Sequence, residues 1–201
     1  MARQPDLDLY FAVLHVLEQT DAPYVIIGAF AGVSYGVTRA TFDVDIVVDL
    51  NERHIAALVK AFPLPRYYAD SEQMRSSIKL GLLFNIIDTT MGRKVDLIPL
   101  TMKPGYGWAL ERRIRRRFMT ATDEPFEAWC ARPEDVVVGK LMAWKEGRST
   151  KHEWDIRDIL AAARLGEDEL SRKFDFEYVN GWAGRLGPEV EQAWRGLKGQ
   201  A

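Results

Sequence analysis

The stretch that most constrains the fold is FDVDIVVDL, residues 42–50, in which β-branched apolar residues alternate with aspartates. Such a run is typical of a buried strand, and side chains two residues apart on a strand lie on the same face. Asp43 and Asp45 therefore share one face, with Cα atoms roughly 6 to 7 Å apart. Carboxylates placed in this way are either solvent-facing positions of an edge strand or half of a site for a hard cation such as Mg²⁺.

Other short apolar runs, separated by segments of helical periodicity, predict a mixed α/β fold. A strand is expected over residues 24–27, ending at Gly28, and a β-hairpin over 82–100 with its turn at Met91-Gly92. A weaker pattern predicts a helix over 107–116 running into a strand over 117–121. Further helices are predicted at residues 6–20, 52–62, 71–80, 133–147, 150–166, 175–187 and 188–197.

This pattern divides the chain into an α/β core, residues 1–103, and a mostly helical part, residues 104–201. The 201 residues carry a formal net charge of −2, so the molecule as a whole is not the basic surface expected of a general nucleic-acid binder. The single cysteine, Cys130, excludes an internal disulfide, and no Cys/His cluster has zinc-site spacing. Neither a signal sequence nor a long apolar run is recognisable, which predicts a cytoplasmic protein without membrane segments.

A third aspartate, Asp96, lies on a later predicted strand, on the same face as Lys94 and Ile98. Three carboxylates on adjoining strands repel one another unless a cation neutralises them. The predicted strand that ends at Gly28 runs into a helix start, where backbone N–H groups attract phosphate. Carboxylates, a cation and a phosphate-binding turn are the parts that phosphoryl or nucleotidyl transfer requires.

These residues resemble a known pattern: Gly28-Ala29, thirteen residues, Asp43-Val44-Asp45, and a later aspartate on a strand. This arrangement is similar to the polymerase-β-type nucleotidyltransferase superfamily, and it implies the small mixed sheet flanked by helices of that fold. Four segments of the chain resemble the AbiEii/AbiGii-toxin-like branch of this superfamily: GVTRATFDVDIVVDL, FNIIDTTMGRKVDLIPL, RPEDVVVGKLMAWKEGR and DIRDIL.

The resemblance implies that Asp43 and Asp45 are paired ligands of Mg²⁺ or Mn²⁺. It implies that Asp96 is the third carboxylate, a further metal ligand and the general base. Gly28 and the amide of Ala29 would contact the phosphates of a nucleoside triphosphate. Alanine replaces the serine or glycine usual at this position, so one phosphate hydrogen bond from a hydroxyl is absent.

In the second half, Lys140 is either a surface lysine or, as the resemblance implies, the residue that neutralises triphosphate charge. Asp155 and Asp158 share one helical face. The family has an aspartate in this segment, and we choose Asp158 as the match. The alternative for either aspartate is a surface salt bridge with Lys151 or Arg157.

Two further sets of basic residues are candidates for binding phosphate. Arg39 is expected either to hold a phosphate or to pair with Asp43. The segment ERRIRRRF holds five arginines that form either a solvated face or a phosphate-binding patch for an RNA acceptor. They are Arg112, Arg113, Arg115, Arg116 and Arg117.

The sequence thus predicts a metal-dependent nucleotidyltransferase that moves a nucleoside monophosphate from a triphosphate to an acceptor hydroxyl. The acceptor is an RNA such as tRNA, a protein or a small molecule. The resemblance to the toxin branch implies the toxin of a toxin–antitoxin pair, with an antitoxin as protein partner. Two alternatives stay open: an antibiotic-modifying nucleotidyltransferase, and a catalytically weak nucleotide- or RNA-binding module, which Ala29 favours.

Overall fold

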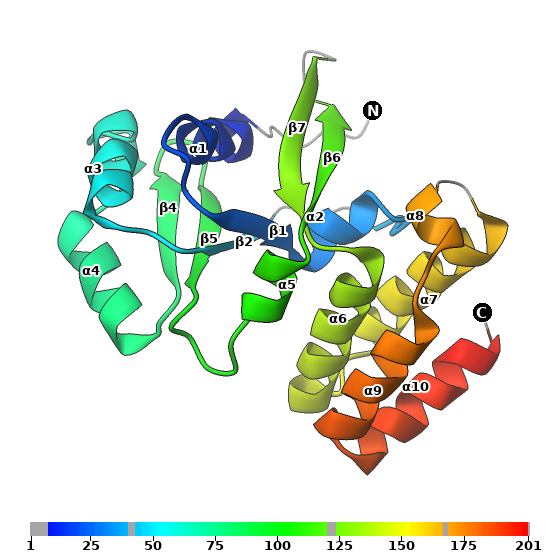
Figure 1. The fold of residues 1–201 in the computed structure, drawn as a ribbon. Coiled ribbons are helices and arrows are strands. Elements are labelled where there is room, and N and C mark those ends of the chain that lie inside the picture. The colour runs from blue at the N-terminus through cyan, green and yellow to red at the C-terminus, as the bar shows by residue number, and fades with distance from the viewer. Residues whose placement is uncertain (1–7, 40–42, 120–123, 167–168, 201) are drawn as a thin grey trace. The chain divides into compact units, whose positions relative to one another are not determined.

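The computed structural model describes residues 8–39, 43–119, 124–166 and 169–200, which form two compact units (Figure 1). The first unit lies within residues 1–26 and 41–130, and the second within 27–40 and 131–201. Compared with the sequence-based division at residue 103, two more strands belong to the first unit and the segment 27–40 belongs to the second. In the described portion, no helix combines the length and the apolarity needed to cross a membrane.

The first unit is built on a mixed sheet whose strand order is β3-β4-β5-β2-β1-β7-β6. The strands are β1 Tyr24–Ile27, β2 Val44–Val48, β3 Tyr67–Tyr68, β4 Phe84–Asp88, β5 Arg93–Pro99, β6 Ile114–Met119 and β7 Pro125–Cys130. Strands β2 and β5 are parallel, whereas β4 and β5 form the predicted antiparallel hairpin. Strand β7 pairs with β1, which extends the sheet beyond residue 103. The predicted mixed α/β fold is confirmed.

The helices of this unit are α1 Asp8–Gln19, α3 Glu52–Ala61, α4 Ser71–Leu80 and α5 Gly107–Glu111. Helix α1 packs against α3 and β5. Asn51 caps α3 by accepting a hydrogen bond from the backbone N–H of His54. The helix predicted over 107–116 is wrong beyond Glu111, because Ile114 already pairs with Cys130 in the β6–β7 ladder. The sequence also makes Asp6 a candidate cap for the first helix and Asp123 a candidate turn residue, and both lie outside the described residues.

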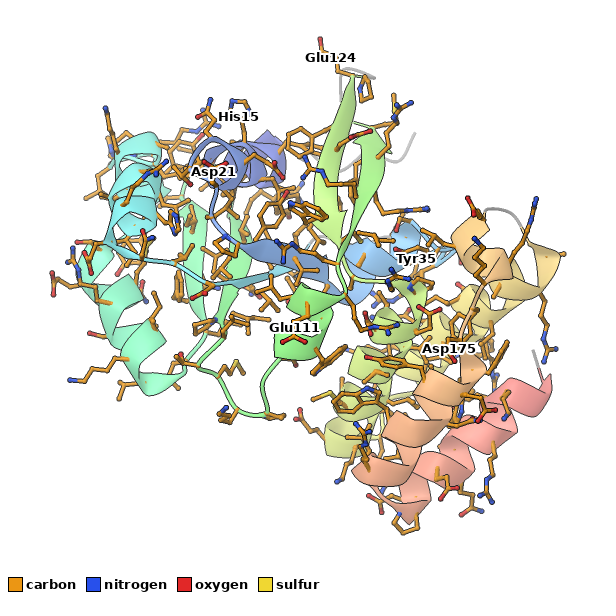
Figure 2. The ribbon with its side chains drawn as sticks, viewed as in Figure 1. His15, Asp21, Tyr35, Glu111, Glu124 and Asp175 are labelled. Carbon is orange, nitrogen blue, oxygen red and sulfur yellow. The ribbon has the colours of Figure 1, made fainter. Side chains whose placement is uncertain are left out.

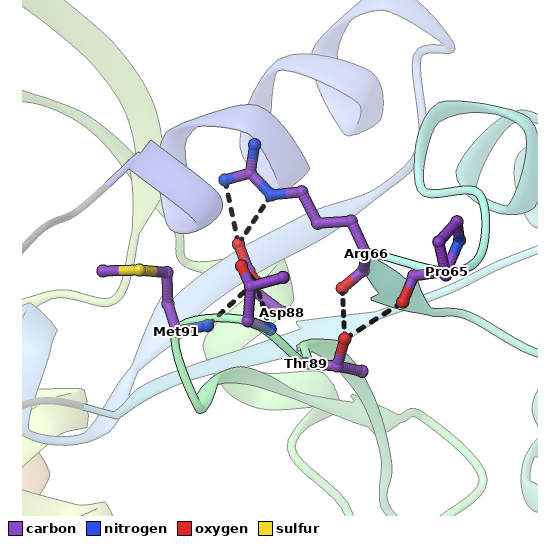
Figure 3. A network of polar contacts seen from close by, with 6 residues as sticks. Pro65, Arg66, Asp88, Thr89 and Met91 are labelled. Atoms are coloured by element: carbon purple, nitrogen blue, oxygen red, sulfur yellow. Dashed lines mark hydrogen bonds and ion pairs between the residues drawn. The ribbon is translucent and has the colours of Figure 1, made fainter.

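Asp88, at the end of β4, stabilises the turn of the hairpin that carries Asp96 (Figure 3). The Asp88 carboxylate accepts hydrogen bonds from Arg66 at 3.0 and 2.9 Å, and from the Thr90 hydroxyl and the backbone N–H of Met91. The hydrogen bond from Thr90, followed by those from Arg66 and the backbone, lowers the pKa of Asp88 to about 2. The turn expected at Met91-Gly92 is therefore held by an ionised carboxylate.

The second unit is helical. Its elements are α2 Gly28–Val33, α6 Pro133–Gly147, α7 Thr150–Leu165, α8 Glu169–Arg172, α9 Phe176–Leu186 and α10 Pro188–Gln200. Helix α6 packs against α2, α7 and α9, and α10 packs against α7 and α9. Asp175, labelled in Figure 2, caps α9 by accepting from the backbone N–H of Tyr178. The sequence would place both Trp194 and Trp154 in helix packing; Trp194 is buried, whereas Trp154 is 60% exposed.

Candidate functional site

The carboxylates predicted as metal ligands lie on neighbouring strands of the first unit. Asp45 on β2 pairs directly with Asp96 on the parallel strand β5, and Asn85 on β4 pairs with Asp96 from the other side. Residues in register on adjacent strands present their side chains on the same face of the sheet. Asp43 lies one residue before β2 and two before Asp45. Asp43 is exposed, Asp45 half-buried and Asp96 buried.

A lysine stands within this group of carboxylates. The Nζ atom of Lys94 lies 2.9 Å from Oδ1 and 2.8 Å from Oδ2 of Asp96. The Nδ2 atom of Asn85 donates a further short hydrogen bond to Oδ1 of Asp96. The hydrogen bond to Asp96 raises the pKa of Lys94, and the negative charges of Asp96, Asp43 and Asp45 raise it further. The chain itself therefore supplies one of the positive charges that three neighbouring carboxylates require.

The sequence identified Lys94 only as a residue on the same face as Asp96. The contact between Lys94 and Asp96 could have been predicted from their separation by two residues, because side chains at i and i+2 of a strand are neighbours on one face. What the sequence lacked was the strand pairing that brings Asp43 and Asp45 to the same place. We call Asp43, Asp45, Asp96 and Lys94 the carboxylate cluster.

The donor chemistry of the carboxylate cluster fits a hard divalent cation, which prefers carboxylate oxygens and water. In the described residues, however, no three or more His, Cys, Asp and Glu side chains are gathered closely enough to hold a metal ion. Both oxygens of Asp96 accept hydrogen bonds from Lys94. The residue types and their register thus suit Mg²⁺ or Mn²⁺. In the structure, the Lys94 ammonium group neutralises part of the negative charge of the carboxylates.

A second charged cluster lies in the helical unit and contains Lys140, Asp155 and Arg39. Lys140 on α6 is 5% exposed, and its Nζ atom lies 2.5 Å from Oδ2 of Asp155 on α7. The Nε and Nη2 atoms of Arg39 donate to Oδ1 and Oδ2 of Asp155 at 2.6 and 2.9 Å. Lys140 is therefore a buried ion-pair partner, and the alternative of a surface lysine is wrong. Arg39, expected to hold a phosphate or Asp43, is paired with Asp155.

The two aspartates of the DIRDIL segment have different partners. Asp155 is 1% exposed. Burial acts to raise the pKa of Asp155, but the hydrogen bonds from Arg39 and Lys140 outweigh it and hold that pKa below its usual value. Asp158 is half-buried and accepts hydrogen bonds from the backbone N–H and the hydroxyl of Thr38, both at 3.1 Å. Asp155 is thus the partner of the two cations, and Asp158 holds the segment that follows α2.

His152 adds a polar group near the second cluster. Within the part of the chain that the structure describes, its buried Nδ1 atom has no hydrogen-bond partner. Burial lowers the pKa of His152, and the positive charges of Lys140 and Lys151 lower it further, against the opposing effect of Asp155. The surroundings of His152 therefore favour the neutral ring, which its position beside the DIRDIL segment alone did not reveal.

The predicted phosphate-contact turn lies at the start of α2. Gly28 has a φ of +70°, a conformation that favours glycine. Ala29 follows it as a buried residue of a helix that ends at Val33. Tyr35, labelled in Figure 2, donates a hydrogen bond to the backbone carbonyl of Ala131 and holds the segment after this helix. The backbone of Gly28 thus has a conformation that favours glycine, and contact of Gly28 and Ala29 with phosphate stays a prediction.

The arginine segment is partly engaged in contacts within the first unit. The guanidinium groups of Arg113 and Arg115 each lie 4.8 Å from the ring centroid of Trp129. Arg115 also pairs with Glu18 on α1 at 2.5 Å, and Arg117 lies 3.9 Å from Glu127. These contacts tie β6 to its neighbours. Binding of RNA by the five arginines stays a prediction.

Comparison with known proteins shows the fold. No protein-family model and no curated protein matches the chain. The solved structure of ANT(2″)-Ia in complex with adenylyl-2″-tobramycin matches with a TM-score of 0.50 and 15% identity, covering 94% of this chain and 97% of that one. An antigenic nucleotidyltransferase-like protein from Paracoccidioides brasiliensis matches with a TM-score of 0.47 and 18% identity, over 94% and 92% of the chains. The chain has the nucleotidyltransferase fold that its motifs imply.

Proposed function

We propose that this protein is a metal-dependent nucleotidyltransferase whose metal is held by the carboxylate cluster. The observation that carries the proposal is the register of Asp45 with Asp96 on adjacent parallel strands, with Asp43 two residues before Asp45. The register sets Asp45 beside Asp96, and Asp43, Asp45 and Asp96 follow one another in the chain order that the resemblance implies. The nucleotidyltransferase fold supports the same assignment.

In the proposed reaction, a hydroxyl oxygen of the acceptor attacks the α-phosphorus of a nucleoside triphosphate. A new phosphorus–oxygen bond forms, the bond from the α-phosphorus to the bridging oxygen breaks, and pyrophosphate leaves. The hydroxyl proton passes to a carboxylate, for which Asp96 is the candidate. A divalent ion, when bound, neutralises charge on the phosphates.

The remaining site residues are proposed from the resemblance, and all of them belong to the helical unit. Gly28, the amide of Ala29 and Lys140 are the proposed contacts for phosphate groups. Of the two aspartates in the DIRDIL segment, Asp155 makes the ion pair with Lys140, which supports it as the residue that positions this ammonium group. Asp158 keeps its proposed role on the motif alone. Arg39 is proposed to act with Asp155, with which it is paired.

The acceptor and the biological role are finer parts of the proposal. The resemblance to the AbiEii/AbiGii-toxin-like branch supports an RNA acceptor such as tRNA and a role as the toxin of a toxin–antitoxin pair. ANT(2″)-Ia, whose complex holds an adenylylated tobramycin, makes aminoglycosides the small molecules to test. A protein hydroxyl is the third class of acceptor.

Transfer of label from each α-labelled nucleoside triphosphate tests the proposal. The purified protein is incubated with Mg²⁺ and, separately, total RNA, cell protein and aminoglycosides. Asp43→Ala and Asp45→Ala should each reduce transfer by more than the roughly 10–100-fold that loss of an outer-shell residue costs. Asp49→Ala is the matched control, because Asp49 is an exposed aspartate just after β2 and lies outside the carboxylate cluster.

The outcomes separate the competing functions. Absence of transfer to every acceptor, together with absence of Mg²⁺-nucleotide binding, would refute the enzyme. Nucleotide binding without transfer would favour the catalytically weak binding module. Growth arrest on expression that disappears in Asp45→Ala, but not in Asp49→Ala, would support the toxin role.

A further inference from the structure

We propose that Lys94 is a built-in counter-cation of the carboxylate cluster, so that a divalent metal binds there only by displacing its ammonium group from Asp96. This inference rests on the proposed function in one respect: it takes the same carboxylates as the metal ligands. It adds a residue that sets the metal affinity of the site. Lys94 does not itself ligate the metal.

The first support is the occupancy of Asp96. An ionised carboxylate offers about four lone-pair positions on its two oxygens. Lys94 occupies one position on each oxygen, at 2.9 and 2.8 Å, and Asn85 takes a second position on Oδ1. An incoming metal ion must therefore exchange with a donor that is already bound, and of these two donors only Lys94 carries a charge that repels it.

The second support is the charge of the cluster. Three carboxylates and one ammonium carry a formal charge of −2, and the charges of Asp43 and Asp45 act on Lys94 together with that of Asp96. A divalent cation near Asp45 and Asp96 would meet a like charge within a few ångströms if the ammonium stayed in place. Like charges at about 4 Å repel strongly where solvent screening is partial.

The third support is the freedom of the lysine to leave. The Lys94 side chain is 45% exposed, whereas that of Asp96 is 12% exposed. A lysine ammonium is a hydrated point charge on a flexible four-carbon stem, so it can move into water at small cost. The Asn85 amide remains on Oδ1 and keeps the Asp96 carboxylate oriented. The geometry thus provides for an exchange of one cation by another.

Binding of Mn²⁺ alone, without nucleotide, tests this inference. Free Mn²⁺ is measured by electron paramagnetic resonance during titration of the native protein, Lys94→Met, Lys94→Arg and Lys60→Met. We expect Lys94→Met to bind Mn²⁺ about tenfold more tightly than the native protein. Lys94→Arg keeps the positive charge and should stay within about twofold of native. Lys60→Met removes an exposed charge from α3 and controls for net charge.

Thermal unfolding is the second readout. With a chelator present, Lys94→Met should unfold at a lower temperature than native, because its carboxylates have lost their counter-cation, and Mn²⁺ should restore more stability to it than to native. Lys94→Gln replaces Lys94→Met if the methionine variant does not fold. Adding Asp45→Asn to Lys94→Met should abolish the tighter binding, which assigns it to the carboxylate cluster.

Unchanged Mn²⁺ affinity in Lys94→Met, no binding by any variant, or an equal gain in Lys60→Met would overturn the inference. Tighter Mn²⁺ binding that depends on Asp45, in a protein that transfers no nucleotide, would support the counter-cation and refute the enzyme. Nucleotide transfer that depends on Asp45, with no effect of Lys94→Met on Mn²⁺ affinity, would support the enzyme and refute the counter-cation.

Discussion

Removing Asp155 should destabilise the helical unit far more than removing the lysine that it binds. Asp155→Ala leaves two cations without their shared anion: Lys140, whose side chain is 7% exposed, and Arg39, whose side chain is 39% exposed. Arg39 can rehydrate, whereas the Lys140 ammonium is left in a buried, uncompensated position. Breaking a buried ion pair from one side costs about 3–5 kcal/mol, and we expect that loss in the free energy of unfolding.

The double variant gives the sharper test. Lys140→Met alone replaces the buried ammonium by an apolar side chain of similar length and leaves Asp155 paired with Arg39, so it should cost no more than about 1–2 kcal/mol. Adding Lys140→Met to Asp155→Ala removes the uncompensated charge. The double variant should therefore be more stable than Asp155→Ala by about 2 kcal/mol, a non-additivity typical of residues in direct contact.

Urea unfolding followed by tryptophan fluorescence measures these differences, because four of the six tryptophans, at positions 144, 154, 182 and 194, lie in the helical unit. The loss of unfolding free energy in Asp155→Ala should become smaller as the pH falls. The pKa of Asp155 is lowered in the folded protein, so its stabilisation is complete above about pH 4 and disappears as the pH falls through the folded-state pKa. A loss below 1 kcal/mol for Asp155→Ala, or strictly additive effects in the double variant, would refute the reasoning.

Three further predictions concern other parts of the structure. The pKa of His152 should lie below its ordinary value in an NMR titration and rise in Lys140→Met, because a neighbouring positive charge is removed; an unchanged value would contradict this contact. The folded-state pKa of Asp88 should be about 2 by carboxyl NMR, and Arg66→Met should raise it. Because this pKa is lowered on folding, ionised Asp88 stabilises the folded protein above about pH 4, and that stabilisation is lost towards pH 2. Gly36 has a φ of +93°, and a Cβ added there would lie only 2.9 Å from the Cβ of Ala162 on α7, which is too close for two carbon atoms. Gly36→Ala should therefore cost about 1–3 kcal/mol in urea unfolding, and a neutral effect would contradict this reading.

Local signals predicted most of the secondary structure. Asn51 and Pro133 begin helices where capping and proline preferences place them, and the run LLFNIID with its turn at Met91-Gly92 forms the expected hairpin. Residues 114–116 were predicted as helix because arginine favours helices, but they pair with β7 as the start of β6. Pairing with a strand distant in the sequence overrides the local helix propensity, and such pairing cannot be predicted from neighbouring residues alone.

The candidate site, too, was predictable in part from local sequence signals and in part only from the tertiary structure. The face shared by Asp43 and Asp45 follows from the strand repeat alone, as does the face shared by Lys94 and Asp96. Tertiary structure decided that these two faces are one, because β2 and β5 pair in a register that sets Asp45 against Asp96.

The sequence by itself determined which elements form and which residue types they carry, because caps, turns and side-chain periodicity act over a few residues. Only the tertiary structure decided which charges meet. Lys94 became the ion-pair partner of Asp96, close enough to Asp43 and Asp45 to feel their charges, and Asp155 became the partner of Arg39, 116 positions away. Electrostatic interactions depend on separation in space, and for these groups the fold sets that separation.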